Sequence, residues 1–343
     1  MVKAICQEVA LKKDRLNGQT VGSIYFGGGT PSVLSTSLLG RIFDTLNRHF
    51  KIAADAEITL EANPDDLDAT KISALTRLPV NRFSIGIQSF FEEDLQWMNR
   101  AHTASEALSC IKRCQDAGFE NLSIDLIYGY PLLSDNKWQQ NIERILSLNI
   151  PHVSAYSLTV EERTALAYAI RQGKQMAPED TQSAAQFQYL SQQLSFAGFE
   201  HYEISNYARP GRYAVHNTNY WRGVPYLGIG PSAHGFDGEL RYANVANNAK
   251  YMQSLAENKL PETLETLSLH DRYNEYVMTA LRTQWGIDLE YLESHFGPDL
   301  HHYALKQAEV LFKQGHLALK DNHLVLSNNG KLFADGAAAQ LFI

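Results

Sequence analysis

The sequence predicts an α/β protein: a partial (β/α)6 barrel that lacks its first strand, followed by a helical C-terminal region of the winged-helix type. Short segments rich in strand-forming residues alternate with longer amphipathic ones at a period of about thirty residues, the length of a strand-helix-strand unit. The chain opens on an amphipathic helix with no strand before it. No dinucleotide-binding glycine pattern follows a strand, so a barrel is favoured over a doubly wound sheet.

The predicted barrel strands are residues 23–26, 57–61, 82–87, 121–128, 151–158 and 198–204. The predicted helices are residues 2–16, 36–50, 66–76, 92–98, 104–117 and 137–147, with a longer helical region over residues 161–196. Strand, helix and strand in this order predict parallel pairing with right-handed crossovers.

Beyond the barrel, residues 202–241 are rich in Gly, Pro, Asn and aromatic residues, which predicts an irregular connector. Helices are predicted at residues 269–283, 288–296 and 302–314, and a β-hairpin at residues 317–320 and 323–326. Three helices and a hairpin are typical of a winged-helix domain. We expect three parts, with bounds 1–205 for the barrel, 206–260 for the connector and 261–343 for the C-terminal domain.

The charge of the chain limits the classes of partner. The 343 residues carry a net charge of −8, which disfavours a general nucleic-acid binder. Residues 261–343 hold eleven acidic and six basic residues, the wrong balance for DNA phosphates, so an accessory packing domain is favoured over a DNA-binding one. No segment has the length of a membrane span or the apolar core of a signal peptide, and a cytoplasmic location is expected.

The first predicted strand ends in a glycine-rich loop, Tyr-Phe-Gly-Gly-Gly-Thr-Pro-Ser at residues 25–32. Consecutive glycines leave backbone N–H groups uncovered, so that a small polar ligand can approach them closely. Thr30 and Ser32 place hydroxyls near the start of the next helix, where unpaired N–H groups and the helix dipole favour negative charge. The loop is therefore either a ligand-binding loop or a tight strand-to-helix turn.

Four polar residues stand at or near the carboxyl ends of the following strands, where a parallel barrel places its ligand site. Glu61 and Gln88 close the second and third strands, Asp125 lies within the fourth, and Arg100 follows a short helix. Carboxylates accept hydrogen bonds from an ammonium group or from sugar hydroxyls, and arginine binds a carboxylate through two parallel bonds. Any one of them alone would be better explained as a cap or a surface residue. Together they predict a zwitterionic ligand that carries ribose hydroxyls.

The three cysteines, Cys6, Cys110 and Cys114, are too few for a disulfide framework and fit a reducing compartment. Cys110 and Cys114 are four residues apart in a predicted helix and share one face. We interpret them as buried structural cysteines rather than part of a metal site, because no third or fourth cysteine lies nearby in the sequence.

Seven segments carry a resemblance that covers essentially the whole chain: residues 25–32, 60–64, 84–89, 125–131, 156–161, 216–221 and 228–234. The chain resembles the oxygen-independent coproporphyrinogen III oxidase family of radical S-adenosylmethionine proteins, and most of all its heme chaperone branch, HemW. The Gly-Gly-Gly-Thr-Pro run alone identifies only the superfamily, whereas the seven segments together are specific.

The resemblance implies S-adenosylmethionine, a [4Fe–4S] cluster and heme as cofactors, and it assigns roles to eight residues. Around S-adenosylmethionine it implies contacts with the methionine end from Gly28, Gly29 and Thr30, with its amino and carboxylate groups from Glu61 and Arg100, and with the ribose from Gln88 and Asp125. Thr159 stands at a position that contacts the nucleoside in the family, which is a weaker transfer.

The segment His-Asn-Thr-Asn-Tyr-Trp at residues 216–221 matches the family motif His-Asn-x-x-Tyr-Trp. The resemblance implies heme binding with His216 as the axial ligand, because a neutral imidazole ligates heme iron. Tyr220 and Trp221 could cover a porphyrin face. A histidine that braces the connector through hydrogen bonds is the alternative interpretation.

Members of this superfamily hold the cluster with three cysteines, spaced Cys-x₃-Cys-x₂-Cys, after the first barrel strand. No such motif occurs in this sequence, and the resemblance offers no metal-ligating residues in its place. Thiolates are what bind such clusters. The absence agrees with the missing first strand, and we expect a chain shortened by about forty residues, one barrel strand and its loop. Radical catalysis by the chain as written is not expected.

Two functions from different classes follow. The first is a chaperone that binds heme and delivers it to hemoproteins. The alternative is an oxygen-independent coproporphyrinogen III oxidase, a radical decarboxylase of porphyrin biosynthesis. The short C-terminal half and the His-Asn-x-x-Tyr-Trp motif favour the chaperone. The expected partners are heme and recipient hemoproteins, with no nucleic acid and no transmembrane segment; peripheral membrane association and a homodimer are compatible with the sequence.

Overall fold

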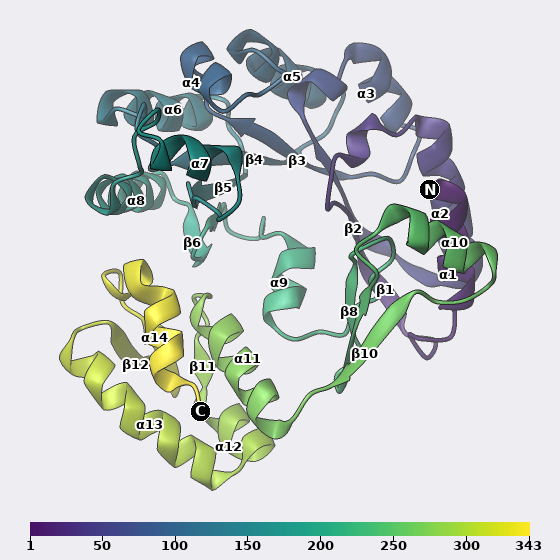
Figure 1. Ribbon diagram of the computed structural model, residues 1–343. Coiled ribbons are helices and arrows are strands. Elements are labelled where there is room, and N and C mark those ends of the chain that lie inside the picture. The colour runs from purple at the N-terminus through teal and green to yellow at the C-terminus, as the bar shows by residue number, and fades with distance from the viewer. The chain divides into compact units, whose positions relative to one another are not determined.

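The computed structural model describes residues 1–343 and has an α/β fold (Figure 1). The strands of its main sheet are β1 (Thr20–Phe26), β2 (Lys51–Ala62), β3 (Arg82–Gln88), β4 (Asn121–Tyr128), β5 (His152–Ser157), β6 (Glu200–Glu203) and β7 (Asn206–Ala208). They lie in the order β1-β2-β3-β4-β5-β7-β6. All six predicted barrel strands are present, with bounds that differ by a few residues.

Strands β2 to β5 pair in parallel with their neighbours, as predicted, and form a curled half-barrel sheet. Their outward side chains are almost purely apolar, and Phe83, Ile85, Leu122 and Ile124 are all buried. Alternation along a strand sends the residues between them to the inner face. The inner face of the same strands is polar, which reserves the inside of the half barrel for polar contacts.

One strand was not predicted, and it changes the pairing at the edge of the sheet. The hairpin partner β7 lies between β5 and β6 and is antiparallel to both. Only two residues separate β6 from β7, too few for the crossover that a parallel pair needs. The predicted parallel pairing therefore does not extend from the fifth strand to the sixth.

The helices of the first part of the chain lie close to their predicted positions. They are α1 (Val2–Leu11), α2 (Thr36–His49), α3 (Ala69–Leu75), α4 (Glu92–Trp97), α5 (Ala104–Asp116), α6 (Asp135–Ser147), α7 (Ala165–Arg171) and α8 (Asp180–Phe196), with single turns η1 (Pro31–Val33) and η2 (Pro64–Asp66). The long helical region 161–196 is two helices, because Gly173 takes a left-handed conformation (φ +67°) just after α7. Figure 1 shows α4, α5 and α6 along one side of β3 and β4.

The predicted irregular connector contains regular structure. It holds the helix α9 (Val215–Trp221), which carries the His-Asn-x-x-Tyr-Trp motif, and the strands β8 (His234–Phe236) and β9 (Leu240–Asn244). These two strands join β10 (Glu262–Thr266) in an antiparallel sheet, and α10 (Asn248–Ala256) lies between β9 and β10 in the chain.

The C-terminal region has the predicted helices and hairpin. Its elements are α11 (Leu269–Leu281), β11 (Ile287–Asp288), α12 (Leu289–Phe296), α13 (Pro298–Lys313), β12 (Leu317–Lys320), β13 (His323–Leu326), the turn η3 (Gly330–Phe333) and α14 (Ala334–Leu341). Asp321 and Asn322 both have positive φ (47° and 64°), the conformation of the two-residue turn that suits a twisted hairpin.

By its internal contacts the chain forms two compact units. The barrel unit comprises residues 25–33 and 58–213, and the connector unit comprises residues 1–24, 34–57 and 214–343. The three-part division expected from the sequence stays a prediction. None of the helices combines the length and hydrophobicity that crossing a membrane requires.

Candidate functional site

The glycine loop lies exposed between β1 and η1 in the barrel unit. A Cβ built on Gly27 would stand 2.5 Å from the Tyr25 ring and 2.7 Å from Glu61 Oε1, so only glycine fits there. A Cβ on Gly28 or Gly29 would meet nothing within 4 Å, and Gly28 has a φ of +78°. The loop therefore has one glycine fixed by close packing and two that leave the backbone open to a ligand.

The hydroxyl of Ser32 is used inside the protein. Ser32 is buried and donates to Asp66 Oδ2 at 2.6 Å. The first full helix after the loop begins only at Thr36, capped by Ser35, whose hydroxyl accepts from the Leu38 N–H. Of the two hydroxyls that were predicted near the start of a helix, only that of Thr30 is exposed. Thr30 precedes the single 3₁₀ turn η1, which is too short to have the dipole of a full helix.

Glu61 is held at the end of β2 by a residue that sequence reasoning did not select. Tyr25 donates its hydroxyl to Glu61 Oε1 at 2.6 Å. Burial, followed by the charge of Glu61, raises the pKa of Tyr25 far above its usual range, so the phenol stays a donor. The position of Tyr25 directly at the head of the glycine motif was the available signal.

A second group converges over Gly86 in β3. A Cβ on Gly86 would lie 2.7 Å from Gln88 Nε2, 3.2 Å from Arg100 Nη2 and 3.5 Å from Asn63 Oδ1. Arg100 donates to Asn63 Oδ1 at 3.1 Å. Burial lowers the pKa of Arg100, with Asp65 and Asp125 acting in the opposite direction. The structure thus brings Gln88 and Arg100 together, with Asn63, which sequence reasoning missed, as the residue that orients the guanidinium.

Asp125 faces Ser84 across neighbouring strands. The Ser84 hydroxyl lies 3.2 Å from each carboxylate oxygen of Asp125. Burial raises the pKa of Asp125 to about 7, against the stabilising hydrogen bond from Ser154, the charge of Arg82 and the Ser84 hydroxyl. A carboxyl group that titrates near neutral pH is a common property of functional sites.

A buried polar cluster supports the segment that carries Gln88 and Arg100. Asp94 in α4 accepts hydrogen bonds from Ser89 at 2.9 Å, Tyr130 at 2.7 Å and Lys137 at 2.8 Å. These contacts tie the end of β3 to α4 and to α6. They hold the backbone of the segment that carries Gln88 and Arg100.

Thr159 lies apart from the groups around Glu61, Gly86 and Asp125. It lies exposed in the segment after β5, and no hydrogen bond or ion pair connects it with the other seven.

In the connector unit, α9 presents the histidine of the His-Asn-x-x-Tyr-Trp motif. Both oxygens of the Glu57 carboxylate accept backbone N–H groups at the start of this helix, from Val215 and His216, each at 3.0 Å. His216 is half-buried, and its Nδ1 lies 3.1 Å from Ser23 Oγ. The N-terminus of a helix favours a carboxylate, so Glu57 holds the backbone at the start of α9. Ser23 orients the imidazole ring of His216.

Aromatic and cationic side chains lock the other end of α9 to α11 and the segment after it. The guanidinium carbon of Arg282 lies 5.5 Å from the Trp221 ring centroid, and that of Arg222 lies 4.2 Å from the Trp285 ring centroid. Such cation–π pairs contribute about 0.5–1 kcal/mol each when exposed. Tyr220 is partly exposed and stands edge-on to Trp221, with centroids 5.9 Å apart.

With this geometry in view, comparisons with known proteins give the family. A Radical SAM superfamily model matches residues 6–145, and a HemN C-terminal domain model matches residues 267–333. A protein from Mycobacterium tuberculosis named heme chaperone HemW is 36% identical over 287 residues, 83% of this chain and 74% of its own length. The chain belongs to the HemW family of radical SAM proteins.

Further similarities agree. The heme chaperone HemW of Bacillus subtilis is 33% identical over 280 residues, 81% of this chain and 74% of its own length. The solved structure of coproporphyrinogen III oxidase (HemN) from Escherichia coli, described as a radical SAM enzyme, superposes with a TM-score of 0.83. It covers 99% of this chain and 82% of its own, at 22% identity. That likeness confirms the predicted fold class, the half barrel with a helical C-terminal region.

The family implies an iron–sulfur cluster, and the residues present do not fit one. Cys110 and Cys114 are buried in α5, as predicted, and the hydrogen bond between them, ahead of burial, raises the pKa of Cys114. The thiol of Cys6 in α1 lies 3.8 Å from the Arg41 carbonyl oxygen. No group of three or more His, Cys, Asp or Glu side chains anywhere in residues 1–343 could hold a metal ion. We derive no radical step for this HemW family member.

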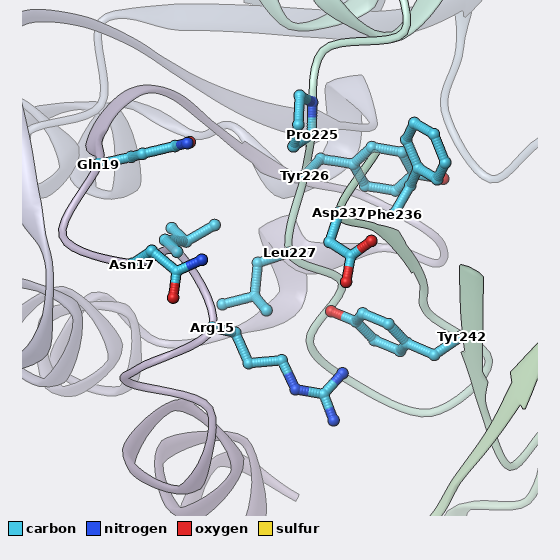
Figure 2. A pocket seen from close by; sticks show the side chains of 10 residues that line it. Arg15, Asn17, Gln19, Pro225, Tyr226, Leu227, Phe236, Asp237 and Tyr242 are labelled. Carbon is cyan, nitrogen blue, oxygen red and sulfur yellow. The ribbon is translucent and has the colours of Figure 1, made fainter. Parts of the chain in front are cut away.

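The connector unit also has a small pocket, of about 50 Å³, between the segment after α1 and the strands β8 and β9 (Figure 2). Arg15 and Tyr242 lie on one side of it, and Asn17 and Gln19 on the other. The Arg15 guanidinium is ion-paired with Glu262 and lies 4.8 Å from the Tyr242 ring centroid. A space of this size holds a few waters at most, so we assign it no cofactor.

Proposed function

We propose that the protein is a chaperone that binds heme at α9 and passes it to recipient hemoproteins. The observation that carries the proposal is the placement of His216 within a chain that is 36% identical to a heme chaperone over 83% of its length. The imidazole is oriented by Ser23 and sits on a helix start fixed by Glu57. A ligand histidine commonly has its second ring nitrogen fixed by a hydrogen bond in this way.

The same geometry describes how heme would be held. With Nδ1 engaged by Ser23, Nε2 would be the nitrogen that ligates the iron. The partly exposed Tyr220 and the neighbouring Trp221 offer aromatic surface to a porphyrin. A protein that delivers its cargo needs a ligand it can release, and a single histidine on a short exposed helix meets that need better than a closed pocket.

We further propose that the barrel unit binds S-adenosylmethionine. The fit rests on the space above Gly28 and Gly29 and on the pairs Tyr25–Glu61 and Asn63–Arg100 that flank it. Glu61 would accept from the amino group, and Arg100, with one N–H engaged by Asn63, keeps further donors for the carboxylate. The backbone of the loop through Thr30 would lie along the methionine end.

At the nucleoside end, Gln88 and Asp125 would contact the ribose, and Thr159 would contact the nucleoside. When bound, S-adenosylmethionine supplies an activated sulfonium; in this chain it serves assembly or regulation of the heme function. A cytoplasmic location, a homodimer and peripheral membrane association stay predictions.

A heme titration followed at the Soret band tests the proposal. His216→Ala is expected to weaken heme binding by more than about tenfold, and Ser23→Ala by about tenfold, because the first change removes the ligand and the second only its orienting partner. His302→Ala, an exposed histidine of α13, is the matched control and should titrate like the unchanged protein. Identical titrations for His216→Ala and the unchanged protein would reject His216 as the ligand.

An assay for coproporphyrinogen III decarboxylation separates the alternative function. The likeness to the Escherichia coli oxidase is one of fold at 22% identity and carries no activity with it. Turnover of coproporphyrinogen by this chain would replace the chaperone proposal; heme binding without turnover supports it.

A further inference from the structure

A continuous row of buried polar side chains crosses the inner face of the barrel unit beneath the proposed nucleoside site. In register across the strands, Ser84 lies opposite Ser123 and then His152, while Asp125 lies opposite Ser154 and then Asn206. Burial is nearly complete for these serines, His152 and Asn206. Buried polar groups of this kind form hydrogen bonds with one another, so each hydroxyl proton is donated to an acceptor within the row.

The Ser154 hydroxyl has more than one possible acceptor. The single hydroxyl proton of Ser154 has the Asn206 Oδ1 atom at 2.9 Å, the Ser123 oxygen at 3.2 Å and the Asp125 carboxylate as acceptors. Ser123 has a nearer partner of its own, His152 Nδ1 at 2.7 Å. The Tyr156 hydroxyl also forms a hydrogen bond with Ser154, and as a neutral phenol it can donate to the serine oxygen. The competition for the Ser154 proton is therefore mainly between Asn206 and Asp125.

Asn206 is fixed in the orientation that takes this proton. Its Nδ2 group donates to Glu203 Oε2 at 2.5 Å, and the same oxygen accepts the Ser205 N–H at 3.0 Å. Glu203 is buried. A flipped amide would turn Oδ1 toward this carboxylate, where two acceptors would face each other. Glu203 thus keeps Oδ1 of Asn206 pointed at Ser154.

The Ser84 hydroxyl and the charge of Arg82 also act on Asp125. Ser84 reaches both of its oxygens only at 3.2 Å. The charged and titratable groups whose interactions reach Asp125 come from β1, β2, β3, β5 and the segment after α4; they are Tyr25, Glu61, Arg82, Tyr156 and Arg100. His152 is neutral, because burial and then the charge of Arg82 lower its pKa well below its usual value. Among these groups the charge of Arg82 lowers the pKa of Asp125 and that of Glu61 raises it.

We propose that Ser154 is a positioning residue whose hydroxyl, shared between Asp125 and the Asn206–Glu203 pair, decides at which pH the Asp125 carboxylate is ionised and can accept hydrogen bonds from a ligand diol. The proposal rests on the S-adenosylmethionine site proposed above and adds a regulation of it. Ser154 itself does not touch the ligand. It acts through the charge of Asp125.

The sign of the effect follows from the pKa of Asp125, which is about 7. Below that pH the carboxyl is protonated and is a poor acceptor for ribose hydroxyls; above it, the carboxylate accepts them, so nucleoside affinity rises as pH passes through about 7. Ser154→Ala removes a donor to the carboxylate and raises the midpoint. Asn206→Ala removes the competing acceptor, frees the Ser154 proton for Asp125 and lowers the midpoint. If the two variants acted only through lost packing, there would be no reason for them to shift the Asp125 midpoint in opposite directions.

Carbon NMR of the ligand-free, full-length chain labelled at aspartate carboxyl carbons measures the midpoint directly, with Asp125→Asn to assign the signal. We expect Ser154→Ala to raise the midpoint by about one pH unit, the size of one hydrogen bond to a charged group, and Asn206→Ala to lower it. Ser157→Ala is the control on the same strand, because the Ser157 hydroxyl donates to Ser183 instead. A midpoint unmoved in Ser154→Ala, or moved in the same direction by both variants, overturns the proposal.

Calorimetric binding of S-adenosylhomocysteine between pH 6 and 8.5 tests the link to the ligand. At pH 7, Ser154→Ala should bind about fivefold more weakly than the unchanged protein, and Asn206→Ala up to about twofold more tightly, the ratios of ionised Asp125 for midpoints one pH unit apart. Failure of the unchanged protein to bind at any pH rejects the nucleoside site itself, while the NMR midpoints still decide the role of Ser154. Binding that is equally strong at all pH values rejects the link to Asp125 alone.

Discussion

Replacing Lys12 by methionine is expected to lower the free energy of unfolding by about 3–5 kcal/mol, because the buried Glu8 carboxylate loses its counter-charge and Glu262 is left with Arg15 alone. The Lys12 ammonium is fully buried and lies 2.6 Å from Glu8 Oε1 and 3.2 Å from Glu262 Oε2. It also donates to the Gly228 carbonyl at 3.1 Å. Methionine keeps the length of the side chain, so the loss measures charge rather than volume.

This cluster joins α1 to the glycine-containing segment that follows α9. Glu8 accepts the Gly230 N–H at 2.8 Å and the Asn244 amide at 2.6 Å. Lys12 adds a cation–π contact, with its nitrogen 4.1 Å from the Tyr242 ring centroid. Loss of Lys12 would therefore weaken the contacts between α1 and residues 228–244 of the connector unit.

Urea unfolding followed by circular dichroism checks the Lys12 prediction. Lys13→Met, one residue along and exposed, is the matched control and should change the free energy of unfolding by less than about 0.5 kcal/mol. Equal midpoints for the two variants would show that the buried cluster does not hold the unit together.

Gly27→Ala is expected to lower the affinity for S-adenosylhomocysteine by at least about tenfold. This corresponds to a loss of about 1.4 kcal/mol of binding free energy. The added methyl group would lie 2.5 Å from the Tyr25 ring and 2.7 Å from Glu61 Oε1. These atoms cannot both stay in place, so the Tyr25–Glu61 hydrogen bond breaks and the carboxylate leaves the position proposed for the amino group of the ligand.

Gly22→Ala is the matched control for this change, because Gly22 lies in β1, the strand that leads into the loop, and a Cβ there meets nothing within 4 Å. It should leave the affinity unchanged. Tyr25→Phe separates the two causes, since it removes the hydroxyl without adding volume. Affinity retained in Gly27→Ala, with the variant folded by circular dichroism, would place the ligand away from Glu61.

Much of the fold could be predicted from periodicity because the parallel strands are buried on their outer face. Phe83, Ile85, Leu122 and Ile124 make β3 and β4 conspicuous in the sequence. The hairpin strand β7 was missed because three residues carry too little pattern to detect. The helix α9 was missed for the same reason, since seven residues rich in Asn and aromatics resemble a connector.

The candidate site was predictable mainly at strand ends, and Asp125 was the predicted residue that lies within a strand. Glu61, Gln88 and Arg100 stand where a parallel sheet collects its functional groups, and the structure places each beside a converging partner. Asn63, just after β2, contacts Arg100, and Ser84 of β3 contacts Asp125 of β4; the sequence alone did not show these pairs. The row through Ser154 and Asn206 depends on β7, the antiparallel strand that was not predicted from the sequence.

Buried charge was the least visible property. Lys12 and Glu8 occupy an amphipathic helix, where charged residues are expected to face water. Their burial depends on Asn244 and Tyr242, more than two hundred residues away in the chain. No local pattern encodes a partner at that separation.

The most direct test of the central claim is heme transfer. The purified chain, loaded with one equivalent of heme, is mixed with an apo-hemoprotein such as apomyoglobin, and the Soret spectrum of the acceptor is followed against a free-heme control. The account predicts that heme binds the unchanged protein through His216, whose Nδ1 lies 3.1 Å from Ser23 Oγ, and then moves to the acceptor. It predicts that His216→Ala binds heme more weakly and delivers correspondingly less of it. A chain that takes up no heme, or that transfers it equally well without His216, would contradict the account.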